Sequence, residues 1–156
     1  MSPHITTISS CSLQGNLDQN YQVNEEEENV LRCVVGTLDL SLRYLSHGQT
    51  FPGEQVKAPF FCLIDRKGLS RYGYIANLCV AKSARRQGIA SRMMQFAIMS
   101  AKKQGAEQVF VHVHRHNTPA QRLYQKMGFE VIEAANSQLS EGETYLLHRE
   151  ISTTKL

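Results

Sequence analysis

The sequence predicts an α/β (α+β) domain in which helices pack on one mixed sheet. Three observations favour this class. The predicted elements follow the order strands, helix, strand, helix, strands. The 156 residues match the size of one domain. Apolar residues make up 42% of the chain and charged residues 20%, a balance typical of folded domains and not of disordered chains.

The chain begins with a polar stretch of 24 residues that lacks helical periodicity. We interpret most of it as flexible, with one short strand over Ile5 to Ile8. It is poor in acids, as a transit peptide is, but it is also poor in arginine. Residues 1–29 are therefore predicted to be a flexible or shortened N-terminal segment, and residues 30–152 the folded domain.

Apolar and β-branched runs predict the strands. The first long one covers Val30 to Tyr44, and the loop Leu45 to Pro59, with two glycines and two prolines, follows it. A turn is predicted over Asp65 to Gly68. The other predicted strands are Phe60–Ile64, Gly73–Val80, Gln108–His114, Phe129–Ile132 and Thr144–Ile151.

The clearest helix is predicted from Ile89 to Gln104, because its apolar residues recur at helical spacing. These residues are Ile89, Met93, Phe96, Ala97 and Ala101, with Met94 and Ile98 widening the stripe. Gly105 follows at the position of a left-handed C-terminal cap.

A second helix is predicted to begin at Thr118. Thr118 is interpreted as its N-cap, with Pro119 at the first helical position and Gln121 three residues after the cap. This helix ends at Met127 and Gly128.

Charge and cysteine content limit the function classes. Between Lys82 and Lys126 there are nine lysines and arginines and one acid, Glu107, which favours an anionic partner or a solvated helix face. No apolar run approaches the ~18 residues of a membrane span. Four scattered cysteines without a C-x-x-C pair argue against a zinc ribbon or a disulfide scaffold and predict free thiols.

An anion cradle is predicted where the strand ending at Val80 meets the helix beginning at Ile89. Arg85, Arg86 and Gln87 precede Gly88. A helix N-terminus carries free N–H groups and a favourable dipole for negative charge, and glycine lets a phosphate approach the backbone.

Two motifs around this cradle give the sequence a family resemblance over about residues 73–132. Arg85-Arg86-Gln87-Gly88-Ile89-Ala90 resembles the pyrophosphate motif [RQ]-x-x-G-x-[GA] of the GNAT superfamily of acetyl-CoA-dependent N-acetyltransferases. The later motif N-x-x-A-x-x-[LF]-Y-x-[KR]-x-G-F is matched by Asn117, Ala120, Leu123, Tyr124, Lys126, Gly128 and Phe129. The local sequence of these motifs looks most like that of the N-terminal and dual-specificity acetyltransferase branch, which includes plant plastid members.

The resemblance implies a twisted, mostly antiparallel sheet with helices on both faces, in which the strand ending at Val80 splays from the strand ending at His114. It also implies acetyl-CoA as cosubstrate, with no metal. The implied coenzyme-binding residues are Leu78, Cys79, Val80, Arg85, Arg86, Gln87, Gly88, Ile89, Ala90, Ser91, Asn117, Thr118, Pro119 and Tyr124.

Three residues receive catalytic roles from the same resemblance. Tyr124 is the implied general acid, since a phenol is protonated at pH 7 and can donate to a leaving thiolate. Tyr74 and His112 match the positions of a strand tyrosine and a strand histidine that hold a water near the amine. Each could instead be a partly buried polar side chain. His112, His114 and His116 also share one strand face, but a metal site there lacks a carboxylate or thiol partner.

The predicted substrate is a protein or peptide N-terminal α-amine, with lysine side chains as further acceptors, because an α-amine is neutralised more easily than a lysine. A chloroplast location follows from the finer resemblance, with cytoplasm and nucleus as alternatives. GNAT domains normally open with a strand and two helices, and the stretch before Val30 has no room for both helices. We therefore expect either a shortened form or an open acceptor side.

Two other function classes stay open. One is a non-catalytic acyl-CoA-binding or interaction module with an incomplete acceptor groove. The other is nucleic-acid binding through the basic window, which no aromatic stacking platform supports. We expect neither nucleic acid nor membrane as a partner, and no pattern indicates an oligomeric state.

Overall fold

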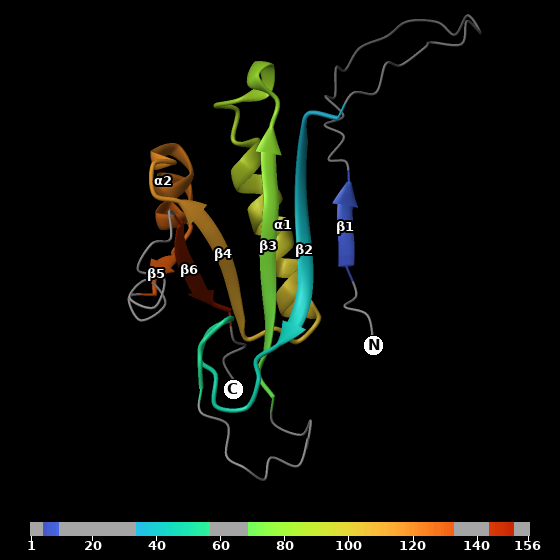
Figure 1. The fold of residues 1–156 in the computed structure, drawn as a ribbon. Coiled ribbons are helices and arrows are strands. Elements are labelled where there is room, and N and C mark those ends of the chain that lie inside the picture. Colours follow the sequence, from blue (N-terminus) through green and yellow to red (C-terminus); the bar gives the residue numbers. More distant parts are fainter. Residues whose placement is uncertain (1–4, 10–33, 57–68, 133–143, 152–156) are drawn as a thin grey trace, which may run out of the picture.

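We analysed a computed structural model, which describes residues 5–9, 34–56, 69–132 and 144–151. Six strands and two α-helices follow the predicted order (Figure 1). The strands are β1 (Ile5–Ser9), β2 (Gly36–Tyr44), β3 (Arg71–Val80), β4 (Gln108–His114), β5 (Glu130–Val131) and β6 (Thr144–Glu150). The α-helices are α1 (Ile89–Lys103) and α2 (Thr118–Lys126), and a 3-10 turn, η1 (Lys82–Ala84), precedes α1.

The sheet has the strand order β1-β2-β3-β4-β6-β5. Only the β3–β4 pair is parallel, so the predicted mixed, mostly antiparallel sheet is confirmed. The β3–β4 register runs from Tyr72 opposite Gln108 to Ile75 opposite Val111 and ends there. Both strands continue beyond this point without pairing to each other, so the predicted splay is present.

Most predicted strands lie within a few residues of the observed ones. The strand predicted from Val30 begins at Gly36, and Val34 and Val35 precede it as irregular chain. The predicted loop after Tyr44 is confirmed over residues 45–56. The predicted strand Phe60–Ile64 and the turn Asp65–Gly68 lie outside the described residues.

Helix α1 packs one face on the sheet. Its buried residues include Met94, Ala97 and Ala101, which join Leu38 and Val109 in the larger of two core clusters. Gly105 has φ +79°, as a left-handed cap requires. Phe96 was predicted to belong to the buried stripe, and this is wrong, because 57% of its surface is exposed. The buried stripe instead follows Met94, Ala97, Ile98 and Ala101.

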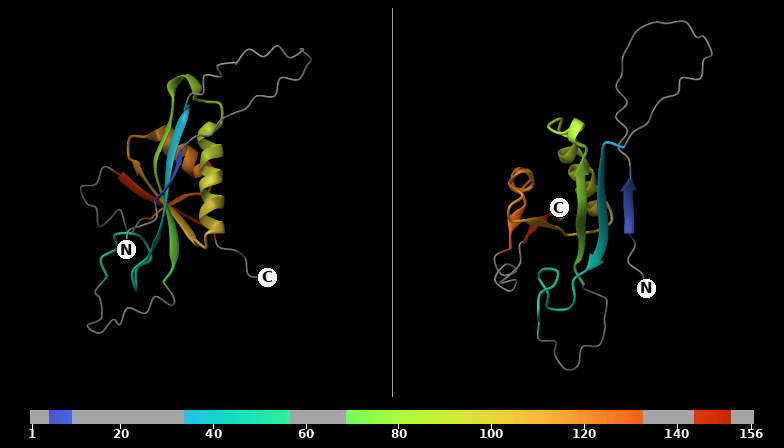
Figure 2. Two further views of the ribbon diagram at one scale, coloured as in Figure 1. Left: turned by 90° about the vertical axis from the view of Figure 1, so that its right-hand side faces the viewer. Right: turned by 45° about the horizontal axis from the view of Figure 1, so that its top comes forward.

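Both helices contribute to this same cluster. Tyr124 of α2 shares it with the α1 residues and with Val111 and Val113 of β4. The alternate strand residues, such as Tyr72 and Phe110, form a second cluster with Leu45 and Phe51 of the loop after β2. Figure 2 shows that loop and α1 on opposite sides of the sheet. The family resemblance implied helices on both faces of the sheet. Among the described residues both α-helices pack on one face, and the loop after β2 covers the other.

Helix α2 begins one residue earlier than predicted. Asn117 is the N-cap, and its Oδ1 accepts a hydrogen bond from the Ala120 N–H at 3.3 Å. Thr118, predicted as the cap, is the first helical residue. The amide of Gln121 turns back and donates to the carbonyl oxygens of His114 and Arg115, which ties the helix to the end of β4. No helix among the described residues is long and apolar enough to cross a membrane.

The cap assignment predicts unequal effects of two neighbouring substitutions. Asn117→Ala removes the acceptor for the Ala120 N–H and is expected to lower the free energy of unfolding by about 1 kcal/mol. Thr118→Ala leaves the cap in place and is expected to change it by less than about 0.5 kcal/mol. Urea unfolding followed by circular dichroism measures both. A larger loss for Thr118→Ala would contradict the assignment.

Candidate active site

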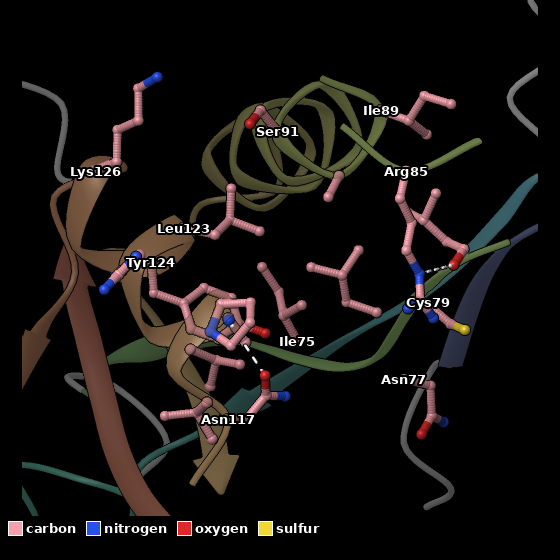
Figure 3. A pocket seen from close by; sticks show the side chains of 18 of the residues that line it. Ile75, Asn77, Cys79, Arg85, Ile89, Ser91, Asn117, Leu123, Tyr124 and Lys126 are labelled. Carbon is pink, nitrogen blue, oxygen red and sulfur yellow. Dashed lines mark hydrogen bonds between the residues drawn. The ribbon is translucent and has the colours of Figure 1, made fainter. Parts of the chain in front are cut away.

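The splay of β3 from β4 opens a cleft of about 880 Å³ between the strands and the two helices. Figure 3 shows Leu123 and Tyr124 on one side of it, Arg85 and Cys79 on the other, and Ile75 between them. Of the residues that the structure describes, four cations and no carboxylate line the cleft. These cations are Arg85, Arg86, Arg122 and Lys126. The cleft therefore suits an anionic ligand.

An irregularity in β3 marks the opening of the cleft. Asn77 has φ +52°, and the β2–β3 register shifts between Thr37 and Asp39. The Asn77 amide donates to Asp39 Oδ2 at 2.5 Å, and the Thr37 hydroxyl donates to the Asn77 carbonyl at 3.3 Å. Asparagine tolerates the left-handed region better than most residues, and these bonds hold it there. Beyond the bulge, the edge of β3 that faces the cleft has no partner strand among the described residues.

The segment predicted to be an anion cradle leads directly into α1, as its sequence predicted. Gly88 is the N-cap of α1, with φ +77°. The first helical hydrogen bond runs from the Arg92 N–H to the Gly88 carbonyl at 3.1 Å. The N–H groups of Ile89, Ala90 and Ser91 therefore precede the helical ladder and can serve a ligand. Apart from the adjoining chain, no atom of the described residues lies within 4 Å of the position that a Gly88 Cβ would occupy, so the space in front of the cradle is open.

Arginines supply charge to this cradle without competing acids. The Arg85 Nε donates to the Val80 carbonyl at 3.0 Å, which fixes the loop to the end of β3 (Figure 3). Arg86 has φ +67°, an uncommon conformation for a side chain of its size. The first turn of α1 holds no acidic residue. The sequence stretch that predicted an anion site thus has the geometry of one.

Tyr124 lies at the opposite wall of the cleft. It is 5% exposed, and its ring packs on Phe129 at 5.7 Å between centroids. Burial raises the pKa of the Tyr124 phenol. A raised pKa keeps the hydroxyl protonated throughout the neutral range, so Tyr124 can donate a proton to a group in the cleft.

Tyr74 and His112 form a hydrogen-bonded pair next to the point where the strands part. The Tyr74 hydroxyl lies 2.8 Å from His112 Nδ1. Part of the His112 ring is exposed, yet the protein around it lowers the pKa of His112 by desolvation. Burial raises the pKa of Tyr74, and the nearby Arg43 opposes this to a smaller extent. At neutral pH the histidine is therefore uncharged and able to accept a proton.

Most of the sequence-predicted coenzyme residues come together in this one cleft. Those that line it are Leu78, Cys79, Val80, Arg85, Arg86, Gly88, Ile89, Ala90, Ser91, Asn117, Pro119 and Tyr124. Gln87 and Thr118 do not line it. His112 lines the cleft, whereas Tyr74 reaches it only through its bond to His112.

Asn77, Arg122 and Lys126 also line the cleft, and none of them had a predicted coenzyme-binding or catalytic role. Asn77 could not be found, because one asparagine in an apolar strand does not reveal a bulge. Arg122 and Lys126 were detectable as a pair of basic residues four apart on α2, which places them on one helix face. The H-x-H-x-H run forms no metal site: the described residues contain no group of three His, Cys, Asp or Glu side chains that could hold an ion.

Residues 17–129 match the Acetyltransferase (GNAT) family, which covers well over half of the chain and includes every element of the cleft. The chain belongs to the GNAT acetyltransferase family. Acetyl-CoA is the cosubstrate of that family.

Known GNAT proteins resemble this one over most of its length. The chloroplastic GCN5-related N-acetyltransferase 6 of Arabidopsis thaliana is 57% identical over 129 residues, which are 80% of this chain and 45% of that protein. An N-alpha-acetyltransferase of Saccharolobus solfataricus is 31% identical over 83 residues, or 52% of this chain and 50% of that protein. The chain thus spans about half the length of these curated relatives.

Solved structures show the same fold. Arabidopsis thaliana NAA60 in complex with a bisubstrate analogue has a TM-score of 0.57 at 21% identity, over 82% of this chain and 72% of that one. NAA60 in complex with acetyl-CoA has a TM-score of 0.56 at 22% identity, over 76% and 66%.

The GNAT cleft fits acetyl-CoA on its own chemistry. Its cations and the free N–H groups at the start of α1 match the charged phosphates of a coenzyme A. The free edge of β3 after Ile75 offers backbone donors and acceptors to an amide-containing arm. The open space at Gly88 leaves room for a phosphate against the backbone.

Proposed function

We propose that this protein is an acetyl-CoA-dependent N-acetyltransferase that moves an acetyl group directly to the N-terminal α-amine of a protein, with lysine side chains as further acceptors. One observation carries the proposal. Tyr124 and the Tyr74–His112 pair lie on the two sides of the point where β3 and β4 part. A proton donor and a proton acceptor thus face the same gap.

In this proposal the chain binds its cosubstrate through the cradle and the β3 edge. When bound, acetyl-CoA supplies an acetyl group activated as a thioester. Ile89, Ala90 and Ser91 offer their N–H groups to phosphate oxygens, and Arg86 adds positive charge. Asn117 caps α2 at the end of the cleft that holds Tyr124. These contacts align the thioester with the gap between the strands, and alignment by itself accelerates a bimolecular transfer.

Tyr124 acts as the general acid in this mechanism. It donates its phenolic proton to the sulfur that leaves, because a phenol with a pKa of about 10 is protonated at pH 7. The transfer to a thiolate whose thiol has a pKa of about 8.5 is uphill by roughly 2 kcal/mol, and the phenoxide then recovers a proton from solvent. The raised pKa of Tyr124 keeps the proton available over the neutral range. A proton transfer of this kind contributes about 10²–10⁴-fold to rate.

His112 acts as the general base, through water, and Tyr74 positions it. In the tautomer with its proton on Nδ1, His112 donates to the Tyr74 oxygen and leaves Nε2 free to accept a proton. The lowered pKa of His112 keeps Nε2 unprotonated at pH 7. An α-amine has a pKa near 8 and a lysine near 10.4, so neutralising lysine costs about 3 kcal/mol more. A weak base of this kind favours the α-amine.

Mass spectrometry tests the proposal. Purified protein is incubated with acetyl-CoA and a mixture of peptides that have free α-amines with and without internal lysines, together with small amines. We expect acetylated α-amines as the main product. Lysine-only products or small-amine products would overturn the substrate class. No product, from protein shown by calorimetry to bind acetyl-CoA, would favour a non-catalytic acyl-CoA-binding module.

If His112 is the general base, the loss of kcat/KM on its substitution should depend on pH. His112→Gln is expected to lower kcat/KM by about 10²-fold at pH 7, where most of the α-amine is protonated. The deficit should shrink above pH 9, because bulk solvent then deprotonates the amine without help. In the native protein, activity should fall as the pH drops through the lowered pKa of His112, since the base becomes charged.

A matched substitution separates this role from a structural one. Tyr74→Phe keeps the ring and removes the bond to Nδ1, so it should show the same pH trend with a smaller deficit. His116→Gln changes a histidine of the turn after β4 that does not line the cleft, and it should leave the pH profile unchanged. A deficit of His112→Gln that is equal at all pH values would rule out the base role.

We also propose a plastid location. The GCN5-related N-acetyltransferases 6 and 7 of Arabidopsis thaliana, to which this chain is similar, are both named chloroplastic. A fluorescent protein fused to the C-terminus of the full-length gene product should colocalise with chlorophyll. Fluorescence confined to the cytosol and nucleus would contradict the proposal.

A further inference from the structure

The acceptor side of the sheet carries an exposed arginine next to the Tyr74–His112 pair. Arg43 lies on β2, opposite Tyr72 in the β2–β3 register. Its guanidinium carbon lies 5.2 Å from the centroid of the Tyr74 ring. The hydroxyl of that same ring bonds His112. The positive charge is therefore fixed beside the group proposed to accept the amine proton.

We propose that Arg43 makes this enzyme prefer acceptors with an acidic side chain next to the reacting α-amine. The inference rests on the proposed function and names the substrate class that the site would select. Three features carry it: the reach of Arg43, its lack of a carboxylate partner within the described part of the chain, and the face on which it lies.

The reach of Arg43 suits the residues that follow the amine. An extended peptide advances about 3.3–3.6 Å per residue. An amine held beside Tyr74 and His112 therefore places its second or third residue within reach of a guanidinium that packs on the Tyr74 ring. The planar fork of arginine binds a carboxylate through two hydrogen bonds, which a lysine cannot do.

No carboxylate among the described residues neutralises Arg43. Its contacts are the ring of Tyr74 and the hydroxyl of Tyr72. Asp39, four residues away on the same strand, accepts the Asn77 amide instead. Glu150 lies three strands across from Arg43, through Tyr72 and Gln108, or roughly 14 Å away at the usual strand spacing. The charge of Arg43 is thus available to a ligand.

Arg43 also lies on the face from which an acceptor reaches the pair. Helices α1 and α2 pack on the opposite face with Val109, Val111 and Val113 of β4. His112 alternates with these valines along β4 and so points to the face of Arg43. Phe110 and His114, the described neighbours of His112 on this face of β4, carry no carboxylate. An acidic acceptor meets attraction here and a basic one repulsion.

A peptide series with a variable second residue tests the inference. The peptides begin Ser-Glu, Ser-Gln and Ser-Lys and are otherwise identical, with every lysine side chain outside the second position replaced. We expect kcat/KM for the glutamate peptide to exceed that for the glutamine peptide about two- to fivefold at low salt, the size of one exposed ion pair. The lysine peptide should be the poorest, and the differences should shrink as salt is added.

Substitutions at Arg43 then test whether this side chain causes the preference for acidic peptides. Arg43→Gln should abolish the glutamate-to-glutamine ratio, and Arg43→Glu should invert the order of the acidic and basic peptides. Lys102→Glu, an equal charge change on the exposed side of α1, should leave the ratio unchanged. Each ratio compares two peptides on one variant, so a general loss of activity through the Tyr74 contact cancels.

The outcomes separate the inference from the function on which it rests. If no peptide is acetylated, the proposed function fails. If all three peptides are acetylated at equal rates, or if Arg43→Gln keeps the preference, the enzyme stands and the role of Arg43 is overturned.

Discussion

Tyr124→Phe is expected to lower kcat by about 10²–10³-fold while the Kd for acetyl-CoA changes less than about twofold. The substitution removes only the phenolic proton donor. The ring keeps its packing on Phe129 and its place in the core cluster. A general acid acts on the leaving group in the transition state, so its loss lowers kcat and not ground-state binding. Stopped-flow measurement of thiol release gives kcat, and calorimetry gives Kd.

Tyr145→Phe is the matched control for this experiment. Tyr145 packs against the same core cluster but does not line the cleft. It should keep kcat within about twofold of the native value. If Tyr124→Phe retained native kcat, the acid would be water or another group. If it weakened acetyl-CoA binding as much as it lowered kcat, Tyr124 would be a binding residue only.

Gly88→Asp is expected to weaken acetyl-CoA binding by about 10- to 100-fold. The new carboxylate would stand in the open space in front of the first N–H groups of α1, where the phosphates bind in our proposal. Two like charges at about 4 Å repel by roughly 1–4 kcal/mol between the limits of bulk water and a partly buried site. The same carboxylate is favourable to the helix itself, because it lies at the positive end of the dipole.

Gly105→Asp controls for the strain of this substitution. Gly105 has φ +79° against +77° for Gly88, and neither glycine has an atom within 4 Å of its would-be Cβ. Both aspartates therefore carry similar backbone strain. Gly105 follows the negative end of α1, so Gly105→Asp should be the less stable variant and still bind acetyl-CoA normally. Equal Kd values for the two variants would place the phosphates elsewhere.

Residue spacing and cap residues predicted α1 and β4 close to their observed bounds. The 3.6-residue spacing from Ile89 and the glycine at position 105 predicted α1 to within one residue. Strand β4 lies where its apolar run predicted it. Gly88 and the apolar spacing after it predicted where α1 begins, and the helix begins at Ile89 with Gly88 as its N-cap. That the stretch from Arg85 to Ala90 binds an anion stays a prediction.

Features that depend on neighbouring elements could not be predicted from spacing. Phe96 fits a helical stripe, but the position of the sheet decides which side of α1 is buried, and Phe96 lies beyond that side. Thr118 and Asn117 are both good caps, and the turn after β4 selects Asn117. Arg43 carries no motif, and only the pairing of β2 with β3 places it beside Tyr74.

The central claim is that the gap between β3 and β4 is a working acetyl-transfer site. Its most direct test follows free thiol and acetylated peptide together over time, with acetyl-CoA and one peptide that has a free α-amine and no lysine. We predict that the two products form in equal amounts, and that blocking the α-amine stops both. Acetyl-CoA that binds tightly while neither thiol nor acetylated peptide appears would contradict the account.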